Sequence, residues 1–113
     1  MVFHKAANVW RVSVLTEKSE LEKLRGEIAI VTLEIFDLCK KRFELARKIA
    51  AVKVKKELPI ENLEIERSLK RRVLDFCHEN NVDDEFCVKL FELLISESKR
   101  VQEEAIKSNI RIQ

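Results

Sequence analysis

The sequence predicts an all-α protein whose protomer has three helices, the first of them very long. Turn-forming residues are almost absent, because the 113-residue chain contains one Gly and one Pro. From about Thr16 the chain runs without a helix breaker to Pro59, apart from Gly26, so a single helix should fill this stretch. A chain this short buries only a modest core, and we therefore expect it to associate with a second copy.

The first helix carries an apolar seam in which residues recur at alternating steps of three and four. The seam consists of Leu21, Leu24, Ile28, Val31, Ile35, Leu38, Leu45, Ile49 and Val52, and Arg42 is its charged exception. A helix of roughly 40 residues is about 60 Å long at about 1.5 Å per residue. Such a helix needs a partner along its length, because isolated helices gain most of their stability from packing.

The ends of the other elements can be placed from capping and turn residues. Residues 1–15 have β-type residues and lack a helical period, so we expect an N-terminal tail or short extended arm before a helical domain at 16–113. A second helix is expected near Asn62 to Asn80, followed by a turn. The third should begin near Asp83 or Asp84 and continue to about Lys107.

Composition excludes several classes of function. Twenty-two basic and 20 acidic residues give a net charge of +2, and the signs are interleaved, so we expect neither nucleic acid nor a membrane as partner. No segment has the apolar length of a membrane span or a signal peptide, which predicts a cytoplasmic protein. Cys39, Cys77 and Cys87 lack the spacing of a zinc site or a disulfide framework, so we expect reduced, buried thiols and no metal.

Three cations of the first helix are candidate binding residues. Arg42 lies in the apolar seam, where a desolvated cation needs an anionic ligand or a glutamate of another helix, unless its side chain snorkels to the edge. Lys53 follows about three turns later on nearly the same face, so both side chains could converge on one small dianion. Arg25 is about 42 Å from Lys53 along the axis and could serve the same site only from another subunit. The alternative for Arg25 and Lys53 is that they are solvated surface cations.

Polar residues of the later helices are further candidates. Ser98 and Gln102 are one turn apart, on or next to the apolar stripe of the third helix, where uncharged polar groups need partners. They could bind a ligand, or Ser98 could bond to its own helix while Gln102 points to solvent. Glu66, at the edge of the second helix, could also be a first-turn glutamate favoured by the helix dipole.

Taken together, these residues are similar to the all-helical chorismate mutase family. The similarity runs without gaps over about residues 20–106 and combines cations, a proline, a serine and a glutamine in the family's order, which makes it more specific than a lone motif. The matching residues are Leu24-Arg25, Ile28, Lys41-Arg42, Leu45-Ala46, Ile49-Ala50, Lys53, Pro59-Ile60, Glu66, Leu90-Phe91, Ser98 and Gln102.

The resemblance implies an intertwined homodimer in which protomers exchange their long first helices. It also implies an isomerase that converts chorismate to prephenate in phenylalanine and tyrosine biosynthesis, by a Claisen rearrangement that needs no cofactor or metal. By position, Arg42 and the partner's Arg25 would hold the two substrate carboxylates. Lys53 and Gln102 would donate to the ether oxygen as its bond to carbon breaks.

The same resemblance assigns the remaining residues and exposes two departures. Glu66 would accept from the ring hydroxyl, and Ser98 would assist a carboxylate. Ile65 stands in place of the family's usual arginine, and Asn62 in place of an aspartate. Losing a charge-assisted contact costs about 1.5–3 kcal/mol, so either activity is reduced or another cation fills the place. Arg67 is nearest in sequence, but it points about 200° away on an ideal helix.

The sequence alone leaves two alternatives to the chorismate mutase hypothesis. Isochorismate-pyruvate lyases share this scaffold and its pericyclic chemistry, and the seam and ether-oxygen residues do not separate the two reactions. A catalytically weak homologue that binds or regulates is the other alternative, and Ile65 is the residue that motivates it.

Overall fold

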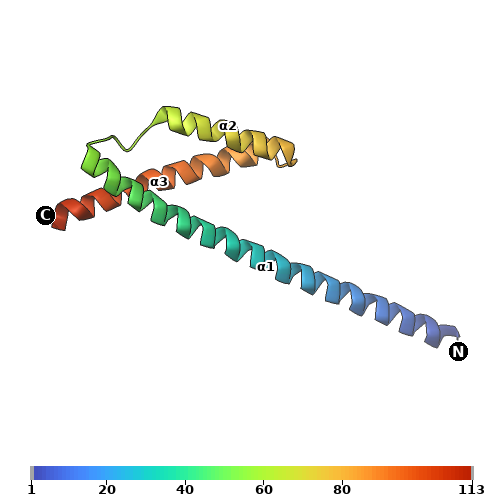
Figure 1. Ribbon diagram of the computed structural model, residues 1–113. Coiled ribbons are helices and arrows are strands. Elements are labelled where there is room, and N and C mark those ends of the chain that lie inside the picture. The colour runs from blue at the N-terminus through green and yellow to red at the C-terminus, as the bar shows by residue number, and fades with distance from the viewer. Residues whose placement is uncertain (1, 113) are drawn as a thin grey trace. The chain divides into compact units, whose positions relative to one another are not determined.

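The computed structural model describes residues 2–112, and side chains are described for residues 16–108. The described chain folds into three α-helices: α1 (Val2–Lys56), α2 (Leu63–Glu79) and α3 (Asp84–Ile112) (Figure 1). The predicted all-α class with a very long first helix is therefore confirmed. Among the described residues, no helix is both long and apolar enough to cross a membrane.

The start of α1 differs from the expectation, whereas its end agrees. We expected a tail or an extended arm at residues 1–15, but helix begins at Val2, so the absence of a helical period did not prevent helix formation. The helix ends at Lys56, ahead of Pro59. Glu57 has a left-handed φ of 55°, and the Leu58 N–H donates to the Lys53 carbonyl at 2.9 Å, as in other helix C-termini. A domain boundary at residue 15 stays a prediction.

The chain divides into two compact units, one up to Cys39 and one from Lys40 onward. In the first unit, the seam residues of α1 from Leu21 to Leu38 are 46–67% exposed. In the second unit, the last turns of α1 bury Ala46 and Ala50. Small side chains at these two positions allow another helix to approach closely.

The second unit also contains α2 and α3, which run alongside each other (Figure 1). The Asn62 side chain caps α2 by accepting from the Ile65 N–H at 3.1 Å, and Asp83 caps α3 by accepting from the Phe86 N–H at 3.0 Å. Between the helices, Asn81 takes a left-handed φ of 55°, which asparagine tolerates better than most residues. The predicted cap of the third helix at Asp83 and the predicted turn after the second helix are therefore confirmed.

A disulfide joins the end of α2 to the first turn of α3, between Cys77 and Cys87, with a Cα–Cα distance of 6.7 Å. The expectation of reduced thiols is therefore wrong for this pair. The tight turn folds α3 back along α2, which brings the two cysteines within bonding reach. Cys39 is a half-buried free thiol.

Candidate functional site

Arg42 joins α1 to α3 in the second unit. Its Nη1 donates to the Leu94 carbonyl at 2.9 Å and to the Ser98 hydroxyl. Arg42 and Ser98 are both half-buried. These contacts hold the guanidinium against α3 and direct the Ser98 hydroxyl toward α1, so the two residues form one polar unit.

Lys53 makes the second connection between α1 and α3. Its Nζ donates to Gln102 Oε1 at 3.0 Å and to the Ile60 carbonyl in the connection to α2. Gln102 is only 6% exposed, so the alternative in which it points to solvent is wrong. Burial lowers the pKa of Lys53, and the negative charge of Glu66 partly opposes this shift.

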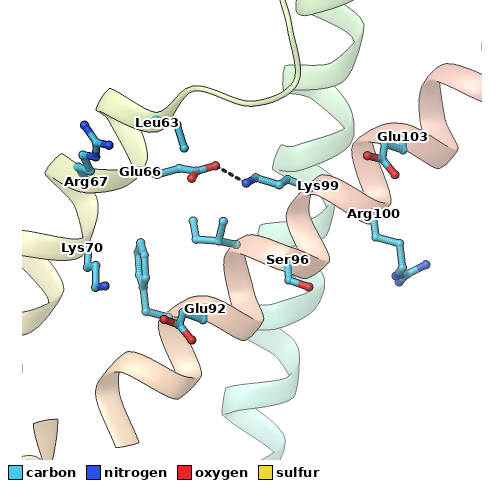
Figure 2. A pocket seen from close by; sticks show the side chains of 11 residues that line it. Leu63, Glu66, Arg67, Lys70, Glu92, Ser96, Lys99, Arg100 and Glu103 are labelled. Carbon is cyan, nitrogen blue, oxygen red and sulfur yellow. Dashed lines mark ion pairs between the residues drawn. The ribbon is translucent and has the colours of Figure 1, made fainter. Parts of the chain in front are cut away.

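Glu66 lies near a second lysine that the sequence analysis did not single out. Lys99 Nζ is 2.9 Å from Glu66 Oε1 (Figure 2). It is also 2.9 Å from Glu61 Oε1. Hydrogen bonds to Glu61 and Glu66 raise the pKa of Lys99. Lys99 follows Ser98 directly and precedes Gln102 by three residues, so its helical position next to the candidate residues was the available signal.

An open groove between α2 and α3 adjoins the pair of Glu66 and Lys99 (Figure 2). Its apolar part comes from Leu63, Phe91 and Ile95. The residues that line this groove do not include Arg42, Lys53, Ser98 or Gln102. Glu66 therefore lines the groove, and its charge also acts on Lys53, which is not among the lining residues.

The two departures from the family pattern have different structural consequences. Asn62 still caps α2, which is the backbone contact that an aspartate also makes. Ile65 is 64% exposed, so its apolar side chain is not absorbed into the core of the single chain. Arg67 is exposed and extends away from the Glu66–Lys99 pair in Figure 2. The cation in contact with Glu66 is instead Lys99.

The structure brings most, but not all, of the predicted site residues together. Arg42 contacts Ser98, and Lys53 contacts Gln102. Glu66 is coupled electrostatically to Lys53. Arg25 belongs to the first unit and is exposed, so its role stays a prediction.

The arrangement provides cations from α1 beside a hydroxyl and an amide from α3. Cationic side chains with uncharged hydrogen-bonding neighbours suit a small anionic ligand that must be held in one orientation. In the described part of the chain, no group of three or more potential metal ligands gathers. The candidate site of this all-helical protein is thus a half-buried cluster of cationic and uncharged polar side chains between α1 and α3.

Comparison with known proteins identifies the family. Residues 24–103 match the family described as chorismate mutase type II. The chain is 30% identical over 88 residues to a chorismate mutase of Methanocaldococcus jannaschii, covering 78% of this chain and 89% of that protein. The chain belongs to the chorismate mutase type II family, and the predicted resemblance is confirmed.

Two further relatives differ in length and in named substrate. A 4-amino-4-deoxychorismate mutase of Streptomyces venezuelae is 27% identical over 89 residues, covering 79% of this chain and 86% of that protein. A bifunctional chorismate mutase/prephenate dehydratase of Buchnera aphidicola is 30% identical over 92 residues, covering 81% of this chain but 24% of that protein. The matched region therefore occurs both as a short protein and as part of a longer one.

Proposed function

We propose that this chain is an isomerase that converts chorismate to prephenate as a homodimer. The observation that carries the proposal is the pair of contacts between α1 and α3, Arg42 with Ser98 and Lys53 with Gln102. These contacts lie within the segment that matches the chorismate mutase type II family. A rearrangement inside one molecule needs positioning and electrostatic stabilisation rather than a nucleophile.

Each cation has a distinct part in the proposed reaction. Arg42, with Ser98 beside it, binds one substrate carboxylate, and the partner's Arg25 binds the other, which favours the compact reactive conformer. Lys53 and Gln102 donate to the ether oxygen, which gains negative charge as its bond to carbon breaks. Because Gln102 Oε1 accepts from Lys53, its amide N–H₂ group is the end that can donate to the substrate.

The homodimer accounts for two features of α1. Its seam residues are 46–67% exposed in one chain, and an apolar stripe of this length is stabilised by a partner. The number of residues between Arg25 and Lys53 corresponds to about 42 Å on an ideal helix, which is why we expect a small substrate to meet both cations only if Arg25 comes from a second copy. The intertwined arrangement, the cytoplasmic location and cofactor-free turnover remain predictions from the sequence.

The relative named for 4-amino-4-deoxychorismate raises the question of which ring substituent Glu66 meets. Chorismate presents a hydroxyl where that compound presents an amino group. We favour the hydroxyl, because Glu66 already contacts the positive charge of Lys99.

The test is to follow the loss of chorismate by ultraviolet absorbance with the purified full chain and to identify the product. We expect prephenate. Salicylate and pyruvate from isochorismate, without turnover of chorismate, would instead identify a lyase. If a folded dimer turned over neither compound, the proposed activity would be wrong, and saturable chorismate binding would then indicate a binding or regulatory homologue.

A further inference from the structure

We propose that Lys99 is a positioning residue that holds Glu66 and makes the enzyme prefer a ring hydroxyl over a ring amino group. This inference rests on the proposed function, because it concerns the substituent that Glu66 meets. Lys99 belongs to neither the cations of α1 nor the residues that carried the resemblance to the family.

The geometry ties Lys99 to the beginning of α2. Its ammonium is 2.9 Å from one carboxylate oxygen of Glu66 and 2.9 Å from Glu61, which lies in the connection between α1 and α2. Figure 2 shows the Glu66 and Lys99 side chains reaching toward each other from α2 and α3. The contact uses Oε1 of Glu66, and the carboxylate keeps further acceptor sites, including its second oxygen, for a substrate donor.

The Glu66 side chain is partly shielded from solvent, so its electrostatic interactions with neighbouring charges are less screened. This side chain is 21% exposed, and that of Lys99 is 29% exposed. The family's usual arginine is replaced by Ile65, so α2 does not supply a cation at that position. From α3, Lys99 places a positive charge against the Glu66 carboxylate. Lys99 thus adds to the interaction between Glu66 and Lys53, and it further offsets the negative charge that a substrate with two carboxylates would approach.

The same positive charge discriminates between the two ring substituents. A hydroxyl donates to Glu66 as a neutral group, so it can share the carboxylate with Lys99. An aliphatic amine is largely protonated at neutral pH, and its charge would lie within a few ångströms of the Lys99 ammonium. Two cations competing for one carboxylate repel each other, which disfavours the amino compound.

The experiment compares kcat/KM for chorismate and for 4-amino-4-deoxychorismate in the full chain and its Lys99→Met and Lys99→Arg variants. We expect Lys99→Met to shift the ratio of the two values toward the amino compound by about tenfold, since screening moderates a partly exposed charge. Lys99→Arg keeps the charge and should keep the ratio of the unchanged protein. A purely structural role would lower both values together and leave the ratio unmoved.

Two controls test whether the change in the kcat/KM ratio is specific to Lys99 and whether it acts through Glu66. Lys89 pairs with Glu85 at 2.9 Å on the surface of the same helix, with both side chains more than 70% exposed, so Lys89→Met should leave the ratio unchanged. In a Glu66→Gln background, Lys99→Met should shift the ratio no further, because Lys99 acts through Glu66. Circular dichroism verifies folding, and Lys99→Gln serves as the neutral variant if Lys99→Met is not folded.

The outcomes separate this inference from the proposed function. An unchanged ratio in folded Lys99→Met or Lys99→Gln would overturn the role of Lys99 while chorismate turnover by the unchanged protein still stood. An equal shift in the Glu66→Gln background would also overturn it. If the unchanged protein turned over neither compound, both proposals would fall.

Discussion

Two faces of α1 have opposite surroundings in the single chain. The apolar residues of the seam, from Leu21 to Val52, are 46–67% exposed, and only its charged exception Arg42 turns toward the packed face. The packed face, formed by Arg42, Ala46, Ala50 and Lys53, meets α3: its two alanines are 3% and 1% exposed, and both cations hydrogen-bond to α3 or its neighbours. The larger apolar side chains are thus on the face that the chain itself leaves exposed.

This difference indicates what each face is for. Small side chains let α3 approach closely enough for two cations to reach its polar groups. Large apolar side chains would contribute most where a second copy covers them, at about 25 cal/mol per Å² of apolar area removed from water. The packed face supplies the part of the proposed site that comes from one chain, and the seam is the surface on which we base the homodimer.

The largest effect is expected on the packed face. Arg42→Ala should reduce kcat/KM for chorismate by about 100-fold or more, because it removes a charge-assisted contact to a substrate carboxylate. Arg47→Ala is the matched control, since Arg47 is an exposed arginine on the same helix, and it should stay close to the unchanged protein. Full activity of Arg42→Ala would rule out the proposed site.

Mixing two inactive variants tests whether the two stretches of α1 meet in one site. Arg25→Ala and Arg42→Ala should each be nearly inactive alone. After unfolding and refolding at equal amounts, about a quarter of the original activity should return, because half of the dimers are mixed and each mixed dimer has one intact site of two. Steady-state assays measure the recovery. Activity no higher than that of the separate variants would contradict a site shared between subunits.

A charged residue introduced on the seam tests directly whether this face of α1 forms the dimer interface. Ile28 is 67% exposed in the single chain, where Ile28→Glu would change stability little. In a dimer the same change buries a charge and costs several kcal/mol, so we expect dissociation in sedimentation velocity. Leu33→Glu, at a 70% exposed position off the seam, should perturb association less. If the Ile28→Glu protein were still fully dimeric, the proposal that the seam forms the dimer interface would be wrong.

The smallest effect is expected at the disulfide between α2 and α3. Replacing Cys77 and Cys87 by alanine should lower the free energy of unfolding by about 2–3 kcal/mol, because the bond closes a loop of 10 residues and restricts the unfolded chain. Chemical denaturation without reductant measures the change. Cys39→Ala is the control, and it should lower the free energy of unfolding by less than the double replacement does. Equal stability of the double variant and the unchanged protein would show that the bond contributes little.

Much of the site could be predicted from helical spacing alone. Arg42 and Lys53 recur on nearly one face of α1, and Ser98 and Gln102 recur on one face of α3, so two facing helices suffice to pair them. The role of Lys99 could not be predicted in the same way. Its contacts with Glu61 and Glu66 join segments more than 30 residues away in sequence, and periodicity along one helix carries no information about such distances.

By itself, the sequence determined the three helices and most of their ends, because capping by Asn62 and Asp83 and the stop before Pro59 depend on neighbouring residues. It also determined which family the chain belongs to, through the order of its polar residues. Only the tertiary structure decided that Cys77 and Cys87 are bonded and that Lys99 holds Glu66. Both contacts depend on how closely α2 and α3 pack, which is set by the sum of many side-chain contacts rather than by any local pattern.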